Sequence, residues 1–224
     1  MNLAQAEAPF FEPEWAVRNL DRIGERLLEH AWLTFLAVGI GLAIALPVGV
    51  YAYRHRRIYA PVTWIAGFLY TIPSLALFAF LTAYTGLTTL TAEIGLVSYT
   101  LLILIRNVVA GLDGVPLDTK QAASGMGYTG RQLLWRVELP LAFPVILAGI
   151  RVATVTIIGL VTVTSLIGKG GLGFFILQGM RRFFSTPIVV GAALSVLLAV
   201  TADVALLGLQ RVLTPWTRSR AGTG

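Results

Sequence analysis

Three glycines have the spacing of a loop that binds phosphate. Gly125, Gly127 and Gly130, within GMGYTGRQ, match the G-x-G-x-x-G pattern of dinucleotide-binding loops. That loop follows a buried strand, whereas the segment before it here, DGVPLDTKQAAS, is no strand. A P-loop would need Lys and Ser or Thr where Arg131 and Gln132 stand. Both nucleotide interpretations are therefore disfavoured, and the surrounding elements must explain the glycines.

The composition is that of a membrane protein. Of 224 residues, 56% are hydrophobic and 12% are charged, whereas a soluble domain carries about 25% charged residues. The chain has no cysteine, and His30 and His55 cannot form a metal cluster alone. We therefore expect neither disulfides nor a metal site. The net charge of +6 favours membrane topology over nucleic-acid binding, because basic residues flank apolar runs.

The apolar runs predict an all-α polytopic membrane protein with about five transmembrane helices. A span needs about 20 apolar residues. The uncharged run 58–92 would be about 51 Å long as one helix, so it must contain a span and a loop. The predicted spans are residues 31–53, about 60–84, about 93–112, 141–168 and 188–213.

The first thirty residues differ from a cleavable signal peptide, because they contain several carboxylates and lack an apolar centre. Trp15, Leu20, Ile23 and Leu27 recur at helical spacing, which predicts an interfacial helix leading into the membrane, with a solvated arm as the alternative. The expected organisation is an interfacial segment (1–30), a transmembrane domain (31–213) with a long loop (113–140), and a tail (214–224).

Lysine and arginine in the loops predict the orientation. If there are five spans, three basic groups fall on one side, and the positive-inside rule makes that side cytoplasmic. The N-terminus is then outside and the C-terminus cytoplasmic. The three groups are Arg54, Arg56 and Arg57, then Lys120, Arg131 and Arg136, then Arg211, Arg218 and Arg220. The opposing basic residues are Arg18, Arg22, Arg26, Lys169, Arg181 and Arg182.

The loop 113–140 has helical signals in both halves. Thr129 and Gln132 form a capping-box pattern that starts a helix with an apolar face. The stretch Gln121–Met126 has helical propensity until Gly127. The glycines are therefore predicted to separate two short helices, which would suit docking into a groove of another protein.

The segment QAASGMGYTGRQLLWRVELP resembles the cytoplasmic EAA loop of permease subunits in bacterial ABC importers. That loop reads Glu-Ala-Ala, three residues, Gly, nine residues, Ile-x-Leu-Pro. The positions that match it are Gln121, Ala122, Ala123, Gly127, Val137, Leu139 and Pro140. The resemblance implies that these residues couple the chain to an ATPase. Gln121 stands where the family has glutamate, so a neutral hydrogen bond replaces any salt bridge to the ATPase.

Four more segments resemble the glycine betaine, carnitine and choline permeases: 71–80, 106–116, 137–151 and 166–173. The resemblance covers about residues 31–213 and implies the type I ABC importer permease fold. It also implies a chain that is not itself an enzyme and holds no cofactor, because the partner ATPase binds ATP and magnesium. The implied partners are ABC ATPase subunits, a second permease chain (identical or different), an extracytoplasmic solute-binding protein and membrane lipid, without nucleic acid.

Several residues in the spans are candidates for solute passage. The pathway candidates are Thr71, Pro73, Ser74, Thr154, Thr164 and Ser165, although hydroxyls in apolar helices more often bond the preceding turn. The aromatic residues Trp64, Tyr70, Phe78 and Tyr84 could contact a quaternary ammonium, although aromatic belts at membrane interfaces are commoner. A flexible loop with Gly168, Lys169, Gly170 and Gly171 is a possible outer gate or a simple turn.

Three charged residues lie within the predicted spans. Arg151 and Asp203 each lie about 15 Å deep by helix rise, which predicts a buried ion pair between two helices, with a role in solute passage as the alternative. Arg106 is interpreted as an interface anchor. Lys169 replaces a small apolar residue of the family and could disfavour a cationic solute at the outer mouth.

The sequence thus favours a permease subunit in the bacterial cytoplasmic (inner) membrane, belonging to an importer of compatible solutes such as glycine betaine, choline, carnitine or proline betaine. Another small solute, such as an amino acid or an ergothioneine-like betaine, is the first alternative. An ion-coupled secondary transporter is less consistent with the sequence. Such a transporter is expected to have ion-coupling carboxylates in its spans, and Asp203 is nearly alone there.

Overall fold

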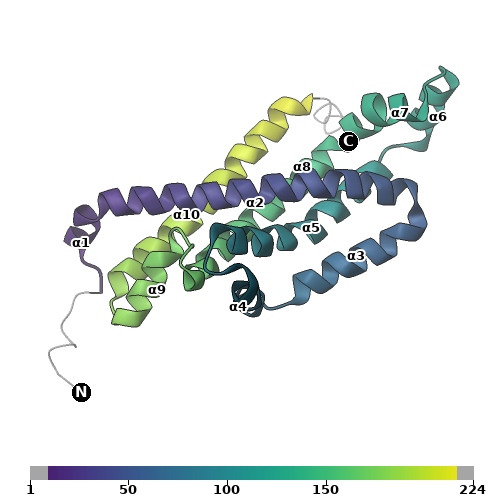
Figure 1. The fold of residues 1–224 in the computed structure, drawn as a ribbon. Coiled ribbons are helices and arrows are strands. Elements are labelled where there is room, and N and C mark those ends of the chain that lie inside the picture. The colour runs from purple at the N-terminus through teal and green to yellow at the C-terminus, as the bar shows by residue number, and fades with distance from the viewer. Residues whose placement is uncertain (1–9, 216–224) are drawn as a thin grey trace.

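A computed structural model describes residues 10–215, which form helices and connecting turns without a strand (Figure 1). The long helices are α2 (Leu20–Arg54), α5 (Thr89–Asp113), α8 (Leu139–Val163) and α10 (Ser185–Leu213). The helices α3 (Arg56–Thr71) and α4 (Ser74–Thr85) form a bent pair. The short elements are α1 (Pro13–Arg18), α6 (Leu117–Gly125), α7 (Gly130–Leu133), the π-helical turn η2 (Leu134–Glu138), the 3₁₀ turn η3 (Thr164–Ile167) and α9 (Gly173–Arg182).

The helices confirm the all-α polytopic class. In residues 10–215, four helical segments are long and apolar enough to cross a membrane, and the pair α3–α4 makes a fifth if it counts as one span. The span predicted at about 60–84 corresponds to this pair, but it is not one continuous helix, because α3 and α4 meet at a bend of 93°. Pro73 causes the bend: it disfavours helical backbone at Ile72, which is extended there.

The first span begins earlier than the sequence predicted. α2 is one helix of 35 residues, so residues 20–30 of the expected interfacial segment continue directly into the membrane helix. Only α1 is separate: it ends at Arg18, and the side chain of the capping residue Asn19 donates to the Trp15 carbonyl at 2.8 Å. Residues 1–9 of that segment lie outside the described part of the chain.

Close packing of α2 against the central helix α5 organises the core. A Cβ added to Gly41 would lie 1.9 Å from Thr100 Oγ1, and one added to Gly49 would lie 2.7 Å from Val108 Cγ1. The two glycines are eight residues apart and face the same neighbour, so the two backbones approach closely. α8 packs against the same central helix, where Ile157 and Val161 join Leu96 in one buried cluster.

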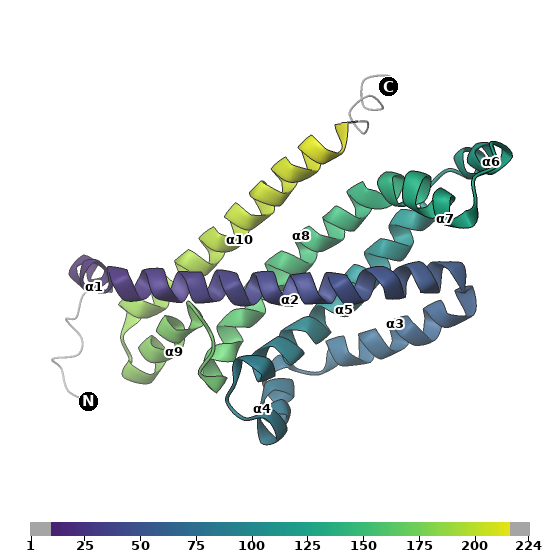
Figure 2. The ribbon, with the colours of Figure 1, turned by 45° about the horizontal axis from the view of Figure 1, so that its top comes forward.

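The helix ends form two groups (Figures 1 and 2). The short helices α6 and α7 lie at the same end of the bundle as the turn from α2 to α3 and the last turns of α10, whereas α1, α4 and α9 lie at the other. The described residues of the three basic groups expected on one side therefore share the α6–α7 end. Arg218, Arg220 and residues 216–224 of the expected tail lie outside the described residues.

A fully buried histidine ties together the end opposite α6. His30 Nδ1 accepts from the Leu172 N–H at 3.3 Å, so its Nε2 carries the proton and donates to the Ile158 carbonyl at 3.0 Å. The imidazole thus joins α2, α8 and the turn before α9. It is a structural connector rather than a candidate metal ligand, and no group of three or more metal-binding side chains occurs within residues 10–215.

We expect His30→Leu to lower the free energy of unfolding by about 2 kcal/mol, because the buried Leu172 N–H loses its acceptor. Denaturant unfolding of the purified protein in detergent measures the change. His55→Leu is the matched control, since His55 is exposed at the other end of α2. Equal stability of the two variants would contradict this role.

Candidate functional site

The loop between α5 and α8 contains the predicted pair of helices. α6 ends at Gly125, and Gly127 has a positive φ of 84°, a conformation that favours glycine. The capping box is present: Thr129 Oγ1 accepts from the Gln132 N–H, and Gln132 Oε1 accepts from the Thr129 N–H at 2.8 Å. The second helix is not a separate element, however, because α7 continues through η2 into the membrane-spanning helix α8.

The residues that match the EAA pattern differ in their exposure. Gln121, Ala122, Gly127 and Pro140 are exposed, Val137 and Leu139 are half-buried, and Ala123 is buried with 2% of its surface accessible. The same loop carries exposed apolar side chains that sequence reasoning did not single out: Leu117 and Met126 at the two ends of α6, and Trp135, which lines a pocket against α2. A surface of small and apolar side chains with one exposed amide is suited to contact with another protein.

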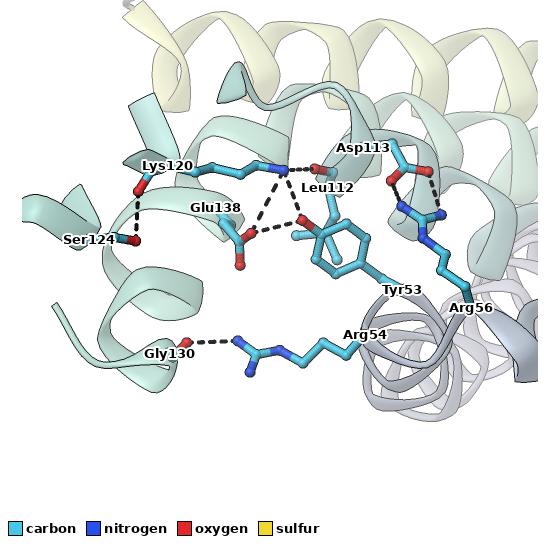
Figure 3. A network of polar contacts seen from close by, with 9 residues as sticks. All are labelled: Tyr53, Arg54, Arg56, Leu112, Asp113, Lys120, Ser124, Gly130 and Glu138. Carbon is cyan, nitrogen blue, oxygen red and sulfur yellow. Dashed lines mark hydrogen bonds and ion pairs between the residues drawn. The ribbon is translucent and has the colours of Figure 1, made fainter. Parts of the chain in front are cut away.

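A hydrogen-bonded network fixes α6 to the membrane helices (Figure 3). Lys120 Nζ donates to Tyr53 Oη at 2.8 Å and to the Leu112 carbonyl at 3.1 Å. Tyr53 in turn donates to Glu138 Oε1 at 2.8 Å, and that oxygen lies 3.8 Å from Lys120 Nζ. The lysine and glutamate side chains are 17% and 5% exposed. One ammonium group therefore links the ends of α2, α5 and η2 to α6.

The basic turn after α2 adds two further connections to this end of the bundle. Arg54 Nη2 donates to the Gly130 carbonyl at 2.7 Å, at the start of α7. Arg56 makes a bidentate ion pair with Asp113, the last residue of α5: two of its guanidinium nitrogens donate to the two carboxylate oxygens. Arginine residues that the sequence assigned to topology thus also hold the loop in place.

Sequence reasoning missed Tyr53, Lys120 and Glu138 as members of this site. Tyr53 and Lys120 are 67 residues apart, and Tyr53 and Glu138 are 85 apart, so no local spacing pattern connects them. The available signal was Glu138 itself, a carboxylate placed between apolar residues just before Leu139 and Pro140.

The structure does not bring the six pathway candidates together. Thr71 lines a pocket of α3 and α5, Thr154 lines an apolar groove of α2, α8 and α10, and Ser165 lines a polar pocket beside α9. Their hydroxyls donate to carbonyls of the preceding turn, and that of Thr164 also does so. Pro73 and Ser74 form the bend between α3 and α4.

The glycine loop between η3 and α9 is packed more closely than its composition suggested. A Cβ on Gly170 would lie 2.3 Å from the Ser165 backbone nitrogen, and one on Gly171 would lie 2.5 Å from His30 Cβ. Gly168 and Gly171 also have positive φ. Close approach and left-handed backbone therefore explain the glycines, and a gate here stays a prediction.

Arg151 and Asp203 form the ion pair that the sequence predicted. Arg151 Nε and Nη2 donate to the two carboxylate oxygens at 2.8 and 2.9 Å, joining α8 to α10. The pair is not fully buried, since the side chains are 23% and 36% exposed. Nearby, the Gln210 amide donates to the Pro144 carbonyl at 3.2 Å and adds a second link between the same helices.

The bundle and its exposed helix pair define a polytopic membrane transport protein. Residues 37–219 match the family described as the inner membrane component of binding-protein-dependent transport systems. The chain therefore belongs to this family and is a multi-pass inner-membrane permease.

Two curated relatives are similar over most of their length. The osmoprotectant import permease protein OsmW of Salmonella typhimurium (strain LT2) is 38% identical, over 88% of this chain and 94% of the relative. The glycine betaine/carnitine/choline transport system permease protein OpuCB of Bacillus subtilis (strain 168) is 35% identical, over 84% of this chain and 86% of the relative.

Solved structures show the same fold. A chain of the MetNI methionine ABC transporter, in an inward-facing conformation, matches with a TM-score of 0.78 at 25% identity, over 88% of this chain and 98% of that chain. A chain of an amino acid ABC transporter matches with a TM-score of 0.66 at 21% identity, over 87% of this chain and 95% of that chain. The type I importer permease fold expected from the sequence is confirmed.

We expect Glu138→Ala to lower the free energy of unfolding by about 2 kcal/mol, because it leaves the half-buried Lys120 ammonium without its carboxylate. Amide exchange in α6 should quicken by about tenfold, as the helix loses an anchor. Mass spectrometry of exchange in detergent measures this, with the exposed Asp118→Ala in α6 as control.

The double variant Lys120→Met/Glu138→Leu should cost less than the sum of the two single changes, because it removes both charges together. Additive losses would show that the two residues act independently.

Proposed function

We propose that this chain is the permease subunit of an ATP-driven importer of compatible solutes such as glycine betaine, choline, carnitine or proline betaine. The observation that carries the substrate class is the similarity to permeases named for osmoprotectant and for glycine betaine, carnitine and choline transport, over more than four fifths of the chain. A separate solute-binding protein delivers the solute, and a second permease chain completes the assembly.

In this proposal the exposed surface of α6 is the docking site for a separate ATPase. The surface offers Gln121, Ala122 and Gly127 with the apolar side chains of Leu117 and Met126. ATP and magnesium bind the ATPase rather than this chain. The α6–α7 end is cytoplasmic, because the basic turn 54–57 lies there. The C-terminus is then cytoplasmic and the N-terminus outside.

The network around Lys120 supplies the mechanism of coupling. A displacement of α6 by the ATPase would move Lys120, and with it Tyr53 on α2, the end of α5 and Glu138. Because η2 continues into α8, the displacement reaches a membrane helix without an intervening loop. The pathway then opens to one side or the other according to the state that the ATPase favours.

We expect Ala122→Glu and Gly127→Pro to abolish ATPase docking without preventing membrane insertion. Ala122 is exposed, so a carboxylate there meets the partner, and proline cannot adopt the positive φ of Gly127. Co-purification of the ATPase measures docking. Ala123→Glu is the contrasting variant, because Ala123 is buried and a charge there should disturb the permease itself. Full ATPase recovery with the first two variants would refute the docking surface.

Reconstitution tests the energy source. In proteoliposomes with the permease assembly, the ATPase and the binding protein, solute uptake should require ATP on the side of α6. It should stop when the catalytic glutamate of the ATPase is neutralised. Sustained uphill uptake driven by an ion gradient, without the ATPase, would refute the proposed function.

A further inference from the structure

An open pocket of about 420 Å³ lies between α3 and α5, away from the coupling helices. It combines an arginine with three aromatic side chains. The lining residues are Thr63, Trp64, Gly67, Phe68, Tyr70, Thr71, Leu102 and Arg106. Thr71 was among the pathway candidates from the sequence, and Trp64 and Tyr70 were among the aromatic residues considered there for contact with a quaternary ammonium.

Arg106 is exposed, and it lies within a membrane-spanning helix. It precedes the last residue of α5, Asp113, by seven residues, or about 10 Å of helix. It makes no ion pair with any residue in 10–215, whereas Arg56 and Arg151 each bind a carboxylate. A guanidinium at this depth is costly against hydrocarbon, which favours a pocket that faces water or an anion over one that faces lipid.

The aromatic side chains of the pocket present open faces. Trp64 and Phe68 are four residues apart on the same side of α3, and they are 80% and 64% exposed. Tyr70 packs edge-on against Tyr99. The Tyr99 hydroxyl donates to the Ile72 carbonyl, so Tyr99 is held in place and in turn positions the Tyr70 ring. Exposed aromatic faces attract a cation that has no hydrogen-bond donors.

We infer that this pocket is a transit site for a small zwitterion that carries both a carboxylate and a trimethylammonium group. Arg106 binds the carboxylate through paired N–H donors, and Trp64, Phe68 and Tyr70 receive the ammonium. The inference rests on the proposed function and deepens it, because it assigns the betaine class to particular residues of the permease. It gives Arg106 a ligand-binding role in place of interface anchoring.

Two other pockets lack this combination. The groove of about 410 Å³ between α2, α8 and α10 has no ionisable lining residue, which suits hydrocarbon. The pocket at Arg26, Arg181 and Arg182 has cations, but its Phe174 ring is already covered by the Arg26 guanidinium at 4.4 Å.

The test measures glycine betaine uptake and ATP hydrolysis together in proteoliposomes that contain the whole importer. Arg106→Gln and Trp64→Leu should each lower uptake per ATP hydrolysed by about tenfold, while ATP hydrolysis stimulated by the loaded binding protein persists. A merely structural defect would lower both quantities together. Arg106→Lys and Trp64→Phe should recover part of the uptake, because they retain the charge and the ring.

Matched controls come from the same chain. Arg57→Gln and Trp32→Leu remove an exposed arginine and an exposed tryptophan outside the pocket, and uptake per ATP should be unchanged. Unchanged uptake per ATP in both pocket variants would overturn the transit site while leaving the proposed function intact. A wild-type importer that moves no betaine at all would instead refute the proposed function.

Discussion

The Lys120 ammonium group is the junction on which the architecture of the α6–α7 end of the bundle depends. It donates to the Tyr53 hydroxyl and the Leu112 carbonyl and faces the Glu138 carboxylate, so four helical segments meet at one cation. A pair buried to this degree contributes little net stability, because both charges lose water. The pair instead fixes the position of α6. An arrangement that separates Lys120 from Glu138 would leave each charge without its partner in a poorly hydrated place, so the observed arrangement of α6 against the bundle is favoured.

Features controlled by neighbouring residues could be predicted from the sequence. The Thr129–Gln132 capping box and the break at Gly127 depend on a few adjacent side chains and backbone angles. The Arg151–Asp203 pair was predictable because membrane thickness converts residue number into depth, and two opposite charges at equal depth have few other partners. The span count followed from the same constraint.

Other features depend on contacts that leave no local signal. The charges between Asp21 and Glu29 interrupt the apolar run but not the helix, so α2 extends beyond its apolar part. α9 was missed because this short amphipathic helix begins directly after a glycine-rich loop, at Gly173, and has a second glycine, Gly179, within it. The Lys120 network joins residues far apart in the chain, and the pocket at Arg106 exists only because α3 turns back alongside α5.

The π-helical turn at η2 has an evolutionary consequence. The Leu139 N–H donates to the Leu134 carbonyl five residues earlier, so this turn accommodates one residue more than an α-helical turn. That extra residue rotates α7 by about 100° relative to a continuous α-helix, since each residue of an α-helix advances by one 3.6th of a turn. A single-codon insertion or deletion in an ancestral gene would thus rotate the proposed docking surface while leaving α8 and its packing untouched. If the proposed docking holds, the direction in which this surface points can evolve separately from the packing of the membrane helices.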